Sequence, residues 1–168
     1  REEESFREMA STLKSLKSLS SLTLEFFGQY RSLQFTKSTS SALQYLKRLK
    51  HLNFYKSDPL ISPYDQTTEL FKGILKIPCL EGLAIGLSEP GLSPSQFQEF
   101  LCNNLKAMTH LKNLKLVMHF MVNIETFEAL CSCIGQLNPL SSLDLQLSLQ
   151  QHMDKKGLER IISIVKYH

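Results

Sequence analysis

The stretch Leu111-Lys112-Asn113-Leu114-Lys115-Leu116-Val117-Met118 has a pattern that recurs along the whole chain. The pattern is a leucine, two free positions, a second leucine, and then apolar residues at every other position. It returns at 19–26, 80–87 and 140–147, and a shorter copy occupies 49–54. The first leucines are therefore 19, 49, 80, 111 and 140, at steps of 30, 31, 31 and 29 residues. Self-similarity at a period of roughly 20–50 residues is typical of a stacked repeat architecture.

The residues before each first leucine follow a helical spacing. Apolar side chains recur three, six and ten positions upstream, with Thr39 as an exception, and such steps place them on one helix face. After the first leucine, apolar and polar residues alternate, which is the period of a strand. Each repeat therefore predicts a helix followed closely by a short strand, and the helix of the second repeat is expected near 41–50. The positions six upstream are Leu13, Leu43, Ile74, Leu105 and Ile134, those three upstream are Leu16, Leu46, Ile77, Met108 and Leu137, and those nine upstream are Ala10, Ser40, Phe71, Cys102 and Cys131.

Capping and turn residues mark the boundaries of these elements. Helix starts are predicted at Thr67-Thr68-Glu69, Ser93-Pro94-Ser95 and Asn123-Ile124-Glu125. Breakers fall in the loops after the strands, at Gly28, Asp58-Pro59, Ser62-Pro63 and Glu89-Pro90-Gly91.

The same template predicts a sixth helix that begins at Gly157, with a next strand leucine expected near position 171, beyond His168. We expect a single domain over 1–168, with five helix–strand repeats plus this helix, that is part of a longer array.

One such unit cannot bury its own apolar stripe, so the units must stack into one continuous core. Stacking puts the strands in one parallel sheet and the helices on its other side. Because helices are about 10 Å wide and strands lie about 4.8 Å apart, the stack should curve with the strands inside. The predicted fold is α/β, a solenoid (horseshoe) with a parallel β-sheet on the concave face and helices on the convex face.

The repeat resembles leucine-rich repeats, and its length and full helices are similar to the ribonuclease-inhibitor-like class. The resemblance covers essentially the whole chain. It departs from that family eight positions after the first leucine, where the family usually has Asn or Cys. Here these positions are Phe27, Ser57, Ser88, His119 and Ser148.

Composition describes an ordinary soluble protein, with 42% hydrophobic and 21% charged residues and a formal net charge of +3. The apolar runs are far shorter than the ~20 residues needed to span a bilayer. The four cysteines are Cys79, Cys102, Cys131 and Cys133. Because the chain has ample apolar residues for a core, we expect reduced, buried thiols and an intracellular, cytoplasmic protein.

The residues do not predict catalytic or metal chemistry. Cys131 and Cys133 lie two apart, so on a helix they point in different directions and cannot chelate from one face. No motif for a nucleophile or a Gly-rich phosphate loop accompanies the histidines. We expect no catalytic residues, no metal and no cofactor.

Lysine and arginine residues recur near the helix ends, and stacking would align them along one rim. They could bind an acidic segment, phosphate or RNA, but cations near helix C-termini also simply complement the helix dipole. The dipole interpretation is favoured, because no aromatic residues interleave with the row. The row consists of Lys14, Lys17, Lys47, Arg48, Lys50, Lys76, Lys106 and Lys112.

The concave face follows from the template, because strand residues between the buried ones point the other way. The middle repeat is unusually small there, which predicts a shallow depression flanked by Tyr55 and Lys115. We expect this face to bind another protein, whose identity does not follow from the sequence. The predicted contact residues are Glu25, Tyr55, Gly82, Ala84, Gly86, Lys115, Asp144 and Gln146.

The function expected from these patterns is a non-catalytic scaffold or protein-interaction module in a larger protein or complex. One alternative is a regulatory module of an enzyme, with an attached catalytic domain or acting on a GTPase as the similarly folded Ran GTPase-activating proteins do. Those proteins use Arg and Asn on repeat loops, and the only central loop arginine here, Arg31, lacks a matching motif. The other alternative is RNA or anionic-surface binding through the basic rim, although nucleic acid is disfavoured as a partner.

Overall fold

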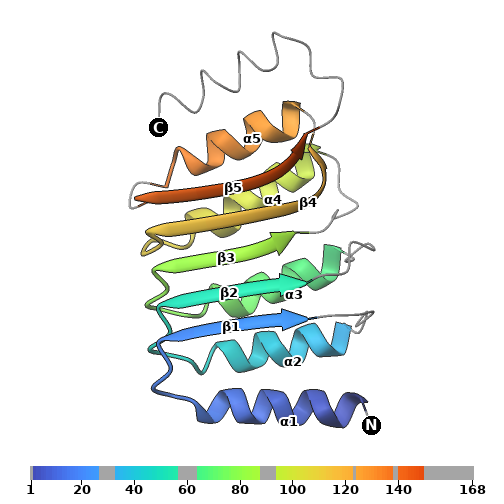
Figure 1. The fold of residues 1–168 in the computed structure, drawn as a ribbon, viewed down its shortest axis with the longest axis vertical. Coiled ribbons are helices and arrows are strands. Elements are labelled where there is room, and N and C mark those ends of the chain that lie inside the picture. The colour runs from blue at the N-terminus through green and yellow to red at the C-terminus, as the bar shows by residue number, and fades with distance from the viewer. Residues whose placement is uncertain are drawn as a thin grey trace.

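The computed structural model describes residues 2–26, 33–56, 64–87, 94–122, 124–137 and 140–149, in which helices and strands alternate (Figure 1). The helices are α1 (Glu2–Ser15), α2 (Leu33–Leu43), α3 (Tyr64–Ile74), α4 (Pro94–Lys106) and α5 (Ile124–Ile134). The strands are β1 (Ser21–Phe26), β2 (His51–Lys56), β3 (Gly82–Leu87), β4 (Asn113–Val122) and β5 (Ser142–Leu149). The predicted sixth helix from Gly157, the four loop breakers and Arg31 lie outside the described residues.

The five strands form one sheet in the order β1-β2-β3-β4-β5, and every neighbouring pair is parallel. The register joins equivalent positions of successive repeats, so that Leu52 lies between Leu22 and Leu83, and Leu114 lies between Leu83 and Leu143. The only irregularity in the described pairings is a register shift against β5 between Met118 and Met121. The prediction of a parallel, in-register sheet is confirmed.

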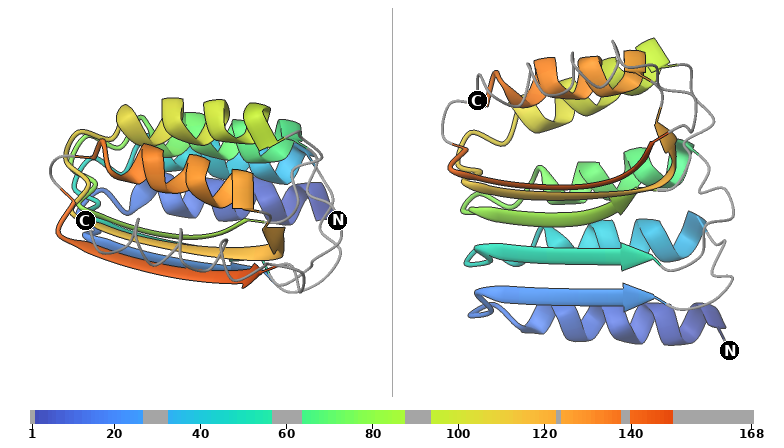
Figure 2. Two further views of the ribbon diagram at one scale, coloured as in Figure 1. Left: turned by 90° about the horizontal axis from the view of Figure 1, so that it is seen from above. Right: turned by 45° about the horizontal axis from the view of Figure 1, so that its top comes forward.

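All five helices lie on one face of the sheet (Figure 2). The helices α1, α2 and α3 pack side by side, as do α4 and α5, while α3 and α4 stand further apart. The core lies between the helices and the sheet, where the leucines of the middle repeats, such as Leu52, Leu83 and Leu114, are buried. The equivalent Leu143 of β5 is 42% exposed, so burial is deepest in the middle of the stack. The α/β class is therefore confirmed.

The residues three positions before each first leucine lie in turns and not on the helices. α2 ends at Leu43, and the amide of Leu46 then donates to the Leu43 carbonyl while the amide of Leu49 donates to the Leu46 carbonyl. A turn with such three-residue steps keeps the side chain on the core side. Periodicity alone therefore extended the helices too far.

The helix predicted near 41–50 is placed too late along the chain, because α2 spans Leu33–Leu43 and the polar run at 38–41 lies inside it and not at its start. Thr36, Thr39 and Ser40 are all buried within this helix. The start expected at Thr67 lies inside α3, whereas Pro94 and Glu125 stand in the first turns of α4 and α5 as predicted.

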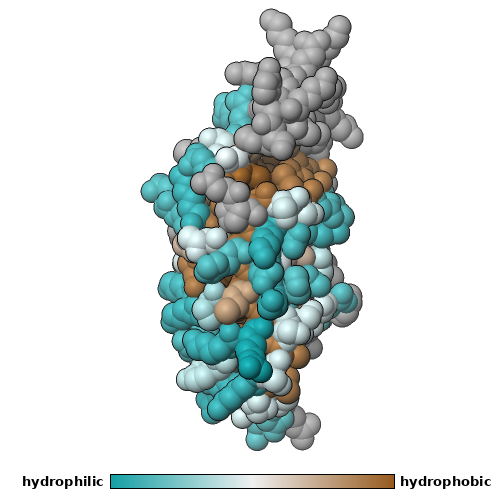
Figure 3. All heavy atoms as spheres, turned by 90° about the vertical axis from the view of Figure 1, so that its left-hand side faces the viewer, coloured by the Kyte–Doolittle hydropathy of each residue, from teal (hydrophilic) through white to brown (hydrophobic). Residues whose placement is uncertain are grey.

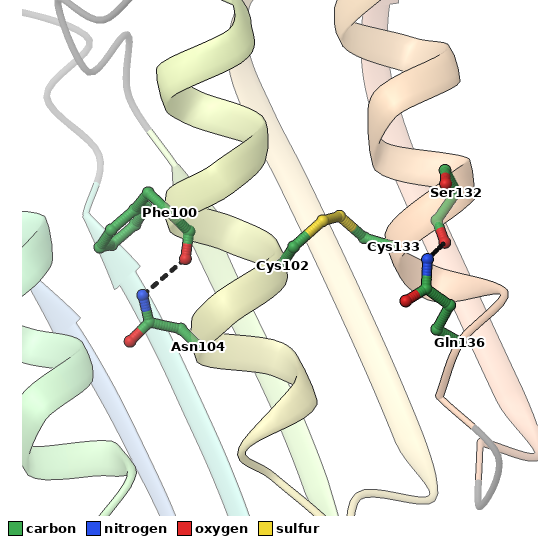
Figure 4. The surroundings of a disulfide bond; sticks show 6 residues. All are labelled: Phe100, Cys102, Asn104, Ser132, Cys133 and Gln136. Atoms are coloured by element: carbon green, nitrogen blue, oxygen red, sulfur yellow. Dashed lines mark hydrogen bonds between the residues drawn. A yellow bond between two sulfur atoms is a disulfide. The ribbon is translucent and has the colours of Figure 1, made fainter.

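The cysteine prediction is also wrong, because Cys102 of α4 and Cys133 of α5 form a disulfide with their Cα atoms 5.1 Å apart (Figure 4). Cys131 is a buried free thiol and Cys79 is an exposed one. Neighbouring helices bring the two bonded residues within the 4.4–6.8 Å that a disulfide needs. The expectation that all four thiols are reduced does not hold.

Candidate functional site

The face of the sheet that points away from the helices, called here the outer sheet face, carries the side chains that alternate with the core leucines. Successive side chains of a strand point to opposite faces, so this surface is set by the same pattern that sets the core. Its members in β1 and β2 are Ser21, Thr23, Glu25, His51, Asn53 and Tyr55, and those in β3 to β5 are Gly82, Ala84, Gly86, Asn113, Lys115, Val117, Ser142, Asp144 and Gln146.

Lys115 of β4 lies at the centre of a cluster on this face. It stands directly opposite Asp144 of β5 in the register, and its Nζ lies 2.8 Å from Asp144 Oδ2. The hydrogen bond that the ammonium donates to Asp144 raises the pKa of Lys115, with a further contribution from Tyr55. The Lys115 side chain is 34% exposed and that of Asp144 is 50% exposed. The lysine is therefore charged, held in place and still accessible to a partner.

The small residues of β3 separate Tyr55 from this ion pair. Ala84 stands opposite Lys115 in the register, and Gly86 stands opposite Val117. Tyr55 on β2 nevertheless acts electrostatically on Lys115, two strands away. The structure thus places Tyr55, Lys115 and Asp144 on the same face of the sheet, with the small residues of β3 between Tyr55 and the ion pair.

The depression expected over β3 is partly filled by the side chain of His51. A Cβ added at Gly82 would lie 2.5 Å from Nδ1 of His51, so the imidazole leans over the glycine. Gly82 and Ala84 are themselves buried. Their role on this face is to admit the longer side chains of β2 and β4, and a partner would touch those side chains first.

The remaining predicted residues lie further from the cluster. Glu25 on β1 stands opposite Tyr55, and Gln146 on β5 stands opposite Val117, and both are exposed. Next to Glu25, the amide of Asn53 donates a hydrogen bond to Thr23 Oγ1 at 3.1 Å. Side chains of neighbouring strands are thus linked across both ends of the outer sheet face.

The edge at which the strands begin holds a charged ladder that the sequence reasoning missed. The Glu81 carboxylate forms ion pairs with Lys50, at 3.0 Å between Nζ and Oε1, and with Lys112, at 3.1 Å between Nζ and Oε2. Hydrogen bonds from these two ammonium groups lower the pKa of the Glu81 carboxyl. Figure 3 faces this edge and shows hydrophilic residues along it, with hydrophobic ones between them. Each member stands one position after a first leucine, so the alternation of Lys, Glu and Lys at one repeat position was the available signal. The carboxylate of Glu81 therefore neutralises part of the positive charge of the predicted basic rim.

Among the described helices, none combines the length and the apolar character required to cross a membrane. In comparisons with known proteins, no family model and no curated sequence matches this chain.

Proposed function

We propose that the chain is a leucine-rich-repeat solenoid, with its sheet on the concave face of a horseshoe, that binds another protein without catalysing a reaction. The equivalent strands stack in register, and the five described helices all lie on the other face of the sheet, which supports this assignment. In such arrays each repeat contacts its neighbours and the open sheet becomes an extended binding surface. The module would serve as a scaffold within a larger protein or assembly.

The cluster of Tyr55, Lys115 and Asp144 is the observation on which this proposal rests. Its side chains are exposed enough to be touched, yet they are fixed on three strands of one sheet and by the 2.8 Å ion pair. A preformed surface loses little conformational entropy on docking. Tyrosine is a frequent anchor of protein interfaces, and paired charges at the rim of a tyrosine contact favour a complementary partner.

Protein is favoured over nucleic acid as the partner by the charges along the strand-start edge. Lys50 and Lys112 share the carboxylate of Glu81, and Lys115 is bound to Asp144, so these three cations are not free for phosphates. The predicted intracellular, cytoplasmic location stays a prediction, and the disulfide removes the argument that was based on reduced cysteines.

The proposal is tested by quantitative affinity capture with cross-linking, comparing two double variants of equal chemistry. Tyr55→Ala with Lys115→Glu changes the outer sheet face, whereas Tyr45→Ala with Lys106→Glu changes exposed residues outside it. We expect the first pair to reduce recovery of the captured partner about tenfold or more, as truncation of interface anchors does. We expect the second pair to leave recovery within about twofold.

Cross-links from the partner should fall on β2, β4 and β5. Equal recovery with both double variants, at equal thermal stability, would remove the outer sheet face as the binding site.

A further inference from the structure

The groove between α1 and α2 contains a hollow of about 380 Å³ on the helix side of the molecule, away from the outer sheet face. Its volume falls within the roughly 300–1,000 Å³ that is typical of small-ligand sites. Residues of both helices line it, among them Arg7, Ser11 and Lys14 from α1, and Lys37, Ser38 and Ser41 from α2.

Three cations converge on this hollow without a carboxylate partner. None of Arg7, Lys14 and Lys37 forms an ion pair with an acidic residue whose side chain the structure describes, and no such carboxylate lines the hollow. Lys14 Nζ instead lies 5.2 Å from the ring centroid of Tyr45, a cation–π contact that steadies the ammonium without neutralising it. This contrasts with Lys50, Lys72, Lys112 and Lys115, each of which is paired.

The positive charge here is not a consequence of the repeat pattern. Arg7 and Lys37 both stand twelve positions before the first leucine of their repeats. In the later repeats the same position is Thr68, Glu99 and Glu128. Among the five described helices, the α1–α2 groove is therefore the one that places two cations at this equivalent position on adjacent helices.

The lining matches the donors that a phosphate group requires. Arginine presents a fork of N–H donors that fits two phosphate oxygens, and lysine adds a compact positive charge. The serine hydroxyls provide further donors for the remaining oxygens. An uncharged or cationic ligand would leave the three cations unpaired in the groove.

We propose that the α1–α2 groove is a binding site for a small ligand that carries phosphate groups. The site lies on the opposite side of the sheet from the protein-binding face, so it is independent of the proposed function. Arg7 and Lys37 hold the phosphates from the two helices, and Lys14 completes the charge at the end nearest Tyr45.

Pyrophosphate is the probe, measured by calorimetry and by backbone amide shifts of the full 168-residue chain at low salt. We expect saturable binding, with the shifts confined to α1 and α2, that weakens as sodium chloride is added. Arg7→Gln with Lys37→Gln should weaken binding about tenfold or more, since charge-assisted hydrogen bonds are lost. The control, Lys47→Gln with Lys106→Gln, removes the same net charge from exposed residues that do not line the hollow and should change affinity less than about twofold.

Vesicles with and without a phosphoinositide identify the source of the phosphate. Vesicle association that depends on Arg7 and Lys37 would assign the site to a lipid headgroup, and pyrophosphate binding without association would assign it to a free ligand. Three results would overturn the proposal: no saturable pyrophosphate binding, an equal loss in the control variant, or binding of single-stranded RNA alone.

Discussion

Two contacts between neighbouring helices, α2 with α3 and α4 with α5, occupy the same place in the repeat but are filled in opposite ways. In each contact, the first helix contributes the residue nine positions before the first leucine of its repeat, and the following helix contributes the residue seven positions before its own. Ser40 thus contacts Gly73, and Cys102 is bonded to Cys133. Ala10 and Ala42, at the same two positions, join one small cluster between α1 and α2. This position pair is therefore where adjacent helices approach most closely. The α2–α3 contact has no side chain on one partner, whereas the α4–α5 contact contains a covalent bond.

In the contact between α3 and α4, the residues at these two positions have larger side chains. They are Phe71 and Asn104, and the ring of Phe71 packs edge-on against Phe100 with the centroids 5.4 Å apart. Here the helices stand further apart, and a hollow of about 290 Å³ lies between their C-terminal ends. The wider spacing of α3 and α4 therefore accompanies larger side chains at these two positions.

Removing the disulfide should give the largest change in stability. In the double variant Cys102→Ala with Cys133→Ala, the unfolded chain is no longer closed across 31 residues. We expect the free energy of unfolding to fall by about 3 kcal/mol, chiefly because the unfolded state gains entropy. Urea denaturation with and without reductant measures this.

The variant itself serves as the control, because reductant should destabilise the wild type and leave the variant unchanged. Thiol titration in denaturant should find two free thiols in the wild type, Cys79 and Cys131. Four free thiols before reduction would contradict the bond.

Filling the glycine of the α2–α3 contact should give the second largest effect. In a helix interior, Gly→Ala normally stabilises by up to about 1 kcal/mol. At Gly73 the added Cβ would lie 2.5 Å from the carbonyl oxygen and 2.6 Å from the Cα of Ser40, and backbone atoms cannot rotate away. We therefore expect Gly73→Ala to destabilise by about 1–2 kcal/mol, as overpacking does.

The matched control is Asn103→Ala, an exposed helical position of α4 that should change stability by less than about 0.5 kcal/mol. If Gly73→Ala were stabilising, the close approach of α2 and α3 would be disproved.

The sequence predicted the strand positions well, because each strand residue has one of two directions and the register follows from the period. Leu52, Leu83 and Leu114 were expected side by side and lie so. Lys115 and Asp144 were expected on the same face, but the ion pair between them was not predicted. The helices were less predictable, since Leu46 keeps the core-facing spacing although its backbone is already in a turn. The disulfide depended on which position of one helix meets which position of the next. That offset is set by the stacking and is not visible within a single repeat.

The buried polar residues of α2 provide a smaller test of how the equivalent helices α2 and α4 differ. Thr39 is fully buried at the position where α4 has Leu101, and its Oγ1 has no hydrogen-bond partner among the described residues. A buried hydroxyl without a partner costs free energy. Thr39→Val keeps the shape and should stabilise by about 1 kcal/mol in urea denaturation.

Thr12→Val provides the control, because the Thr12 hydroxyl is exposed and already bonded to the Glu8 carbonyl at 2.9 Å. It should not stabilise. A loss of stability in Thr39→Val would show that the hydroxyl of Thr39 has a partner.

The smallest effect concerns Cys131 of α5, which lies two residues before the bonded Cys133 but remains a free thiol. Burial raises the pKa of the Cys131 thiol to about 11, and the charge of Glu128 adds to this. Because the thiolate is the reactive form, iodoacetamide at pH 8 should modify the exposed Cys79 and spare Cys131 in the native protein. The folded pKa exceeds that of the unfolded thiol, so this residue favours folding below the unfolded value and loses that contribution as the pH rises toward about 11. Peptide mass spectrometry across this pH range measures both rates, with Cys79→Ser as the control that isolates Cys131. Equal labelling of Cys131 and Cys79 at pH 8 would mean that the Cys131 thiol is open to solvent in the native protein, although Cys133, two residues away on α5, is held in the disulfide.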